Sequence, residues 1–281
     1  MFFRNEHRAS IIDAGHSCKS RIDLEDVLRG IVCRMKKVVT FLSDFGTSDA
    51  YVAQVKARIL SSAPDVLIVD ITHEVASYTV LSGAWLLYTT YACFAEGTIH
   101  LAVVDPGVGT DRAIVMVKKA GHIFIGPDNG IFSFLYPADE ITEVTWRPHS
   151  PISPTFHARD IFAPVVVKML ENPSWEGIGT PLIDPVTIDV RQPMVVHIDK
   201  FGTVVTNIDC SVVRQGVTLA CGGTVISGVA GTFSDIPEGR TALLCGSSNT
   251  IEIAANRGNA AREIGAYVGM PIQLNFADSH A

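Results

Sequence analysis

The sequence predicts an α/β protein in which an N-terminal parallel-sheet α/β domain precedes a small C-terminal β-barrel domain. Apolar strand-like runs alternate with helix-like segments over residues 35–170, which is the rhythm of a parallel sheet. Residues 171–194 lack periodicity and contain four prolines, so a linker is predicted there. From 195 to 281, short β-rich runs are separated by Gly and Asp, a pattern typical of a small barrel.

Residues 1–34 differ from both predicted domains. They carry mixed charge and show little periodicity, apart from a helix-like stretch at 22–32. We interpret them as an N-terminal extension with no assigned function. Met35 is followed by two lysines and an apolar run, and we expect it to be the natural start of the protein.

The α/β domain opens with the run VVTFL at 38–42, whose continuous apolar character predicts a buried strand. After a turn-rich segment, Val52, Val55 and Ile59 recur at helical spacing and predict a helix over 51–60. Ser48 is suited to cap the N-terminus of that helix. The same patterns predict strands at 67–71, 99–104, 113–117 and 122–125, and helices at 83–94 and 161–170.

The β-barrel domain is predicted from short runs rich in β-branched residues, each bounded by turn-forming residues. These predicted strands cover 195–198, 203–208, 217–220, 223–226, 241–244, 250–254 and 271–275.

Composition and charge narrow the class of protein. The chain is 47% apolar and only 18% charged, which favours an oligomer that buries surface between subunits. The net charge of -7 and the lack of a Lys/Arg cluster argue against nucleic acid or an anionic membrane as a partner. We find neither an apolar segment of bilayer length nor the apolar core of a signal peptide, and therefore expect a cytoplasmic protein.

The six cysteines are scattered along the chain, with no CxxC pair and no histidine at metal-ligand spacing. We therefore expect free thiols in a reducing compartment and no metal site.

Carboxylates end three of the predicted strands, where ligands bind in parallel sheets. Asp44 could accept two hydrogen bonds from a vicinal diol such as a ribose, or could equally cap the following helix. For Asp70, with His73 in the same turn, a local structural role is favoured. Asp105 opens the loop DPGVGTDR, which lacks the lysine of a phosphate-binding loop.

Two further polar residues could act with Asp105. Arg112 could return along the loop and pair with Asp105, although a structural ion pair is the ordinary interpretation. His157 precedes a predicted helix and could carry a proton near neutral pH, although a lone histidine more often packs or lies at the surface. In the second half, the polar loops at 199–203 and 246–250 could bind an amino-acid carboxylate or be ordinary hairpin turns.

Taken together, several segments resemble one family, the adenosine-forming S-adenosyl-L-methionine (SAM) hydrolases. These enzymes are also called SAM hydroxide adenosyltransferases and are related to the SAM-dependent fluorinase and chlorinase. The resemblance covers residues 35–273 in order. Its motifs are SDFG around Asp44, DITHEV from Asp70, DPGVGTDR from Asp105, GPDNG around Asp128, TFHARDIFAP around His157, DKFGTVVTNI from Asp199, and GSSNTIEIAANRGNAAR from Gly246.

The resemblance implies an α/β domain, a C-terminal barrel, and a homotrimer with active sites between subunits. It implies that Asp44 binds the ribose hydroxyls and that Tyr78 and Phe156 line the adenosyl pocket. It further assigns the methionine end of SAM to Asp199, Ser247 and Ser248, and adenine to Phe201, Thr203, Asn256, Asn259 and Ala260. Thr203 stands where relatives usually carry an asparagine, and Ala158 stands where glycine or serine is common.

The resemblance also implies the chemistry. Asp105, Arg112 and His157 match the triad that activates water, whereas halogenases place uncharged groups where Asp105 and His157 stand. The expected reaction is hydrolysis of SAM to adenosine and L-methionine, by in-line attack of water on the ribose 5'-carbon, without a metal or cofactor. The alternatives are a SAM-dependent halogenase and a sensor that binds SAM or adenosine without turnover.

Overall fold

The structure, a computed structural model, describes residues 37–172, 174, 176–213 and 217–276. The predicted N-terminal extension, including the helix-like stretch at 22–32 and Met35, lies outside the described residues. Among the described residues, no helix is both long and apolar enough to cross a membrane.

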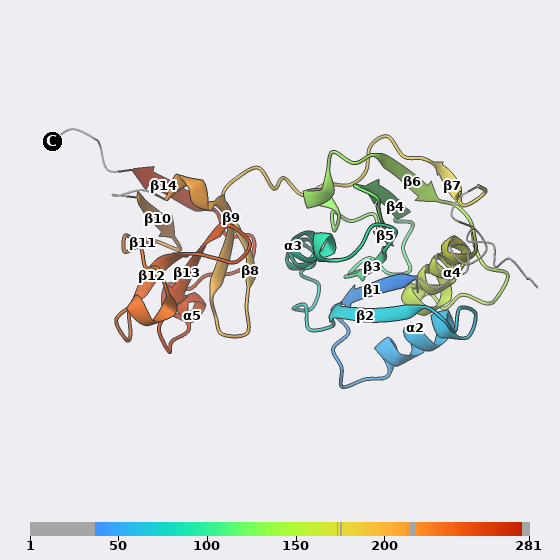
Figure 1. Ribbon diagram of the computed structural model, residues 1–281, viewed down its shortest axis with the longest axis horizontal. Helices are drawn as coiled ribbons and strands as arrows, with labels where there is room; N and C mark the ends of the chain where they lie inside the picture. The colour runs from blue at the N-terminus through green and yellow to red at the C-terminus, as the bar shows by residue number, and fades with distance from the viewer. Residues whose placement is uncertain (1–36, 173, 175, 214–216, 277–281) are drawn as a thin grey trace, which may run out of the picture. The chain divides into compact units, whose positions relative to one another are not determined.

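The N-terminal sheet has seven strands in the order β2-β1-β3-β5-β4-β6-β7 (Figure 1). The strands β2, β1, β3 and β5 run parallel, whereas β4 pairs antiparallel with both β5 and β6. The predicted parallel sheet is therefore a mixed sheet. Its strands are β1 (Val38–Ser43), β2 (Leu67–Thr72), β3 (Ile99–Val103), β4 (Ile114–Lys119), β5 (His122–Pro127), β6 (Glu140–Val144) and β7 (Gly179–Pro181).

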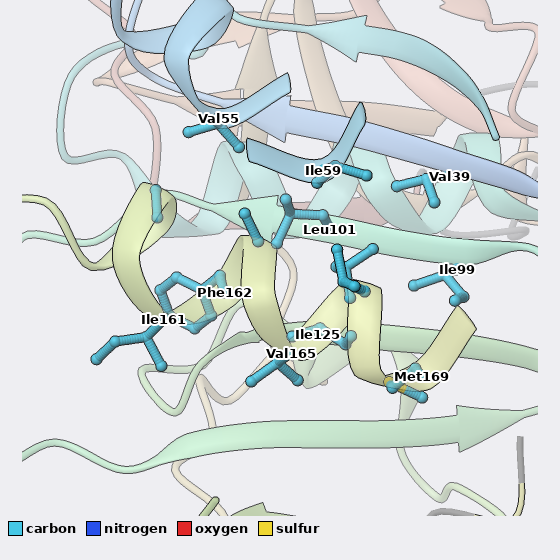
Figure 2. Packing of buried hydrophobic residues seen from close by; sticks show 14 of the residues in the cluster. Val39, Val55, Ile59, Ile99, Leu101, Ile125, Ile161, Phe162, Val165 and Met169 are labelled. Atoms are coloured by element: carbon cyan, nitrogen blue, oxygen red, sulfur yellow. The ribbon is translucent and has the colours of Figure 1, made fainter. Parts of the chain in front are cut away.

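Helices cover both faces of this sheet. The helices α2 (Tyr51–Leu60) and α4 (Ala163–Glu171) contact each other and share one apolar core with β1, β3 and β5. Figure 2 shows Val55 and Ile59 from α2 and Val165 and Met169 from α4 over the side chains of these strands. On the other face, α3 (Val80–Thr90) packs in a second core. Alternate residues of each strand point to opposite faces, so both cores draw on the same strands.

Three details of this domain differ from the sequence expectation. The helix α2 has no side-chain cap, so the prediction that Ser48 caps it is wrong. The predicted helix at 83–94 begins and ends earlier, as α3, and the predicted helix at 161–170 is preceded by a π-helical turn, η3 (Ala158–Phe162). Short 3₁₀ turns lie at η1 (Tyr91–Cys93) and η2 (Ser133–Leu135) in this domain, and at η4 (Cys210–Val212) and η5 (Phe233–Asp235) in the C-terminal domain.

The C-terminal domain consists of two antiparallel sheets that share an apolar core, with a smaller apolar cluster beside β12 and β13. One sheet has the order β12-β13-β9-β8 and the other the order β11-β10-β14 (Figure 1). The strands correspond to the seven predicted runs: β8 (Val195–Ile198), β9 (Val204–Asp209), β10 (Val217–Cys221), β11 (Thr224–Ile226), β12 (Thr241–Cys245), β13 (Thr250–Ala255) and β14 (Ile272–Phe276). A short helix, α5 (Ala260–Ile264), was not predicted.

Two cysteines of this domain form a disulfide, so the expectation of free thiols is wrong for Cys210 and Cys245. Cys210 directly follows β9, and Cys245 ends β12. These two strands flank β13 in one sheet, and the Cα atoms of the two cysteines lie 5.7 Å apart, within the usual range for a disulfide. Their separation of 35 residues gives no sign of this pairing. Cys93 and Cys221 are free, and Cys18 and Cys33 lie outside the described residues.

Candidate active site

The loops that follow β1 and β3 enclose a cavity of about 260 Å³ together with the segment that precedes η3. Asp44 directly follows β1, and Asp105 comes two residues after the end of β3. These parallel strands end at the same edge of the sheet, which brings the two carboxylates to one site. The cavity is lined by Asp44, Phe45, Tyr51, Ser77, Tyr78, Val103, Asp105, Val108, Thr155, Phe156, His157 and Ala158.

Asp105 and Arg112 form a two-pronged ion pair at this cavity. The Arg112 Nε donates to Asp105 Oδ1 at 2.8 Å, and Nη2 donates to Oδ2. The side chains of Arg112 and Asp105 are only 10% and 5% exposed, so the pair is largely removed from water. Paired donors of this kind fix the orientation of both groups. The predicted contact is confirmed.

His157 completes the predicted triad on the other side of the guanidinium. Its Nδ1 lies 3.2 Å from Arg112 Nη2. Because a guanidinium only donates hydrogen bonds, Nδ1 must accept, and the proton of the neutral ring resides on Nε2. Burial, and then the charge of Arg112, lower the pKa of His157, against the opposing effect of Asp105. The ring is therefore neutral at pH 7.

The close packing of two loops brings the triad together. A Cβ atom at Gly109 would lie 2.3 Å from the Pro154 carbonyl oxygen, and the φ of Gly109 is +81°. Only glycine fits such an approach at a positive φ. The loop carrying Arg112 can thus reach the segment carrying His157. The Phe162 ring packs under the guanidinium, with its centroid 5.4 Å from Cζ.

Asp44 is held by the loop that follows β2. Its Oδ2 accepts a hydrogen bond from the backbone N–H of Tyr78 at 2.9 Å. Tyr78 adopts a φ of +67°, and its side chain is 74% exposed. Because α2 has no side-chain cap, Asp44 does not cap it, which removes one of the two interpretations left open above.

Aromatic rings form the remaining wall of the cavity. Phe156 packs edge-to-face with Tyr51 at a centroid distance of 5.3 Å and with Phe45 at 6.1 Å. Of these three aromatic residues, Phe156 was predicted from the sequence, whereas Phe45 and Tyr51 were not. Phe45 directly follows Asp44 in the sequence, and this position beside a predicted site residue is the one signal that could have indicated its place at the cavity.

The residues predicted to bind the methionine and adenine groups do not line this cavity. All of them belong to the C-terminal domain. Several form hydrogen bonds within that domain: Asp199 Oδ1 accepts from the N–H groups of Phe201 and Thr203, Asn259 caps α5, and Asn256 donates to the Ile236 carbonyl oxygen. Thr203 and Ala260 are buried, whereas Phe201 is 67% exposed. Ser247 and Ser248 lie in the turn between β12 and β13.

Comparisons with known proteins agree with this architecture. Two family models match, the SAM hydroxide adenosyltransferase N-terminal domain over residues 39–179 and the C-terminal domain over residues 194–273. A solved structure of an uncharacterized conserved protein from Thermotoga maritima superposes with a TM-score of 0.77 and 32% identity, covering 84% of this chain and 100% of that one.

Curated relatives include a protein from Thermus thermophilus named (R)-S-adenosyl-L-methionine hydrolase. It is 34% identical over 257 residues, covering 84% of this chain and 98% of its own length. A protein of the same name from Methanocaldococcus jannaschii is 37% identical over 179 residues, covering 61% of this chain and 66% of its own. A fluorinase from Nocardia brasiliensis is 28% identical over 205 residues, covering 62% and 68%. The chain therefore belongs to the SAM hydroxide adenosyltransferase family.

Proposed function

We propose that the chain hydrolyses SAM to adenosine and L-methionine, with water attacking the ribose 5'-carbon. The observation that carries this proposal is the charged cluster of Asp105, Arg112 and His157 at the cavity that Asp44 also lines. The relatives named (R)-S-adenosyl-L-methionine hydrolase support the choice of substrate.

The charge of the substrate decides what the protein must supply. A sulfonium leaves as a neutral thioether, so the departing methionine needs no proton donor. The remaining requirement is to hold a water in line with the bond that breaks and to favour the loss of its proton. The substitution is driven by the charge of the substrate itself and uses neither a metal nor a redox cofactor.

The triad divides this task among its members. The Nδ1 of His157 is engaged by Arg112, so its Nε2–H donates to the water and orients it. Asp105 accepts a hydrogen bond from the same water and takes its proton as the new C–O bond forms. Arg112 offsets the carboxylate charge, which lowers the cost of hydroxide character beside Asp105.

The adenosyl group occupies the rest of the cavity. Asp44 accepts hydrogen bonds from the ribose hydroxyls. Within the part of the chain that the structure describes, its Oδ1 has no hydrogen-bond partner, whereas Oδ2 is held by Tyr78. Phe156 and Tyr78 supply aromatic surface at the cavity.

We also propose a homotrimer with sites between subunits. Pockets that enclose a drug-sized ligand usually measure about 300–1,000 Å³. The cavity of about 260 Å³ falls below that range and includes no residue of the C-terminal domain. A neighbouring subunit would supply Asp199, Ser247 and Ser248 for methionine, and Phe201, Thr203, Asn256, Asn259 and Ala260 for adenine. The cytoplasmic location stays a prediction.

The decisive experiment incubates the protein with SAM in ¹⁸O-labelled water, with and without chloride. We expect equimolar adenosine and methionine, with the label in the 5'-hydroxyl of adenosine because water attacks carbon. Formation of 5'-chloro-5'-deoxyadenosine would identify a halogenase instead. Tightly bound adenosine with no release over hours would identify a sensor.

The variant Asp105→Asn tests whether the reaction takes place at this site. Removing the proton acceptor should lower kcat by about 100-fold or more, the usual contribution of a general base. Adenosine affinity, measured by calorimetry, should change little because Asp105 does not hold the nucleoside. Normal turnover in this variant would remove Asp105 from the mechanism.

A further inference from the structure

A line of polar side chains runs behind Asp44, away from the cavity. The hydroxyl of Ser43 lies 2.7 Å from His73 Nδ1, and His73 Nε2 lies 3.1 Å from Asp70 Oδ1. Lys56 Nζ contacts the other oxygen of Asp70 at 2.5 Å. The line joins the end of β1 to the end of β2 and to α2.

The order of Ser43, His73 and Asp70 is that of a nucleophilic serine triad. Ser43 is completely buried, however, and His73 is only 3% exposed, so the hydroxyl cannot touch a substrate. Neither residue lines the cavity. The arrangement therefore requires a role other than nucleophilic attack.

The surroundings of His73 favour one direction for its hydrogen bond to Ser43. The Asp70 carboxylate lies 3.1 Å from Nε2, and its charge favours the proton on that nitrogen, although among the described residues Nε2 has no partner with hydrogen-bond geometry. Nδ1 then accepts from the Ser43 hydroxyl. The Ser43 oxygen can then accept from the backbone N–H of Phe45, 3.4 Å away. Burial opposes ionisation of Asp70, but the hydrogen bond from Lys56 and the nearby His73 ring outweigh it and lower the pKa of this carboxyl.

The backbone of His73 also holds the turn that follows β1 and contains Asp44. Its carbonyl oxygen accepts a hydrogen bond from the backbone N–H of Gly46 at 2.7 Å. Asp44 thus lies between two positions, Ser43 and Gly46, that are both bound to His73. The loop that begins at His73 continues to Tyr78, whose positive φ is unfavourable but whose N–H binds Asp44.

We propose that His73 is a positioning residue that fixes the Asp44 carboxylate for recognition of the ribose hydroxyls. The inference rests on the proposed function, because it takes from there the role of Asp44. His73 acts through the Ser43 hydroxyl and through the turn that both residues hold, and it touches no substrate atom.

Two substitutions separate the contacts of His73. Asparagine places an amide oxygen near the position of Nδ1 and can keep the bond to Ser43. Glutamine reaches toward the position of Nε2 and loses that bond. We expect His73→Gln to raise the KM for SAM and the Kd for adenosine roughly tenfold, as weakening one hydrogen bond to a charged group does. His73→Asn should raise both by less than about threefold, and kcat should change less than twofold in either variant.

Two controls distinguish positioning from a general loss of structure. His122 is buried to a similar extent, at 4% exposure, and lies outside the cavity, so His122→Gln should lower the melting temperature without raising KM. The ligand 2',3'-dideoxyadenosine lacks the hydroxyls that Asp44 would bind. Its Kd should be the same for the native protein and for His73→Gln.

The outcomes are distinct. Unchanged KM in His73→Gln, or an equal loss of affinity for adenosine and dideoxyadenosine, would overturn the role of His73 while leaving SAM hydrolysis intact. An undiminished effect of His73→Gln in an Asp44→Ala background would overturn it as well. A native protein that neither hydrolyses SAM nor binds adenosine would overturn the proposed function, and this inference with it.

Discussion

At the scale of single residues, the guanidinium of Arg112 determines which atom of His157 is available for chemistry. The Nδ1 of His157 accepts from Arg112, which leaves the Nε2–H as the group that can meet a water. Protonation of Nδ1 would remove this acceptor and place a cation beside Arg112. The proposed mechanism therefore requires the neutral imidazole of His157.

This requirement predicts the pH dependence of catalysis. Burial and Arg112 lower the pKa of His157 from 6.5, so the neutral form persists below that pH and is lost only as the pH falls further. We expect kcat/KM to be constant between about pH 7 and about pH 8. At lower pH it should decline with an apparent pKa below that of a free histidine. The measurement is an initial-rate profile of adenosine release.

The matched variant is His157→Gln, which cannot be protonated in this range. It should have a lower kcat and should lose the acid limb assigned to His157. An acid limb that is centred above pH 6.5 in the native protein, or that persists unchanged in the variant, would contradict the assignment.

At the scale of elements, two loops must touch for the triad to exist. Gly109 lies against Pro154, with no room for a Cβ atom. Gly107, in the same loop, has ordinary space around its missing Cβ, with the nearest atom, Thr110 Oγ1, at 3.5 Å. The two glycines thus offer a matched pair of substitutions.

We expect Gly109→Ala to separate the Arg112 loop from the His157 segment. The clash and the positive φ should cost about 1–3 kcal/mol of stability and lower kcat by at least about tenfold. Gly107→Ala should change kcat much less. Chemical denaturation and adenosine release measure the two effects, and equal behaviour of the variants would show that the loop contact is unimportant.

A disulfide joins two elements of the C-terminal domain, β12 and the turn after β9, next to the predicted methionine-binding serines. Cross-linking a loop of 35 residues restricts the unfolded chain. The free energy of unfolding of the double variant Cys210→Ser/Cys245→Ser should therefore be lower by about 4 kcal/mol. Urea denaturation of oxidised protein measures this loss, with Cys93→Ser as the control at an exposed free thiol. Equal stability of the native protein with and without reductant would contradict it.

The elements also show what the sequence could predict. Apolar runs such as VVTFL identify buried strands, and the rule that ligands bind at strand ends leads to Asp44 and Asp105. The strand β6 was missed because its sequence mixes polar and apolar residues, and β7 was missed because it has only three residues at the sheet edge. The pairing of Cys210 with Cys245 depends on strand order, which no local pattern encodes.

Residue roles divide in the same way. The bond from Arg112 to Asp105 could be anticipated because both residues belong to one short loop. The contact of Arg112 with His157 spans 45 residues, and only family resemblance suggested it. From the sequence, His73 was expected only to form a local turn. Its links to Ser43 and Gly46 exist because β1 and β2 are neighbours in the sheet, and the sequence around His73 does not show this.

At the scale of the whole molecule, the proposed trimer divides each site between two subunits. Asp105 lines the cavity of the N-terminal domain. Phe201, which is 67% exposed, belongs to the part of the site that we propose a neighbouring subunit supplies. Phe201→Ala should weaken stacking on adenine by about 1–3 kcal/mol and lower activity at SAM concentrations below KM. Because the ring is exposed, this change should leave the fold intact.

Mixing these two defective proteins tests the division directly. Co-expression of Asp105→Asn and Phe201→Ala chains in equal amounts should give mixed trimers, confirmed by mass. In a cyclic trimer, a native site takes its N-terminal part from a Phe201→Ala chain and its C-terminal part from a neighbouring Asp105→Asn chain. Each of these choices has a probability of about one half in an equal mixture, so about a quarter of the sites should be native. Activity below KM should then rise well above that of either variant alone. If each site lay within one subunit, every site in the mixture would carry a defect, and activity would stay at the average of the two variants.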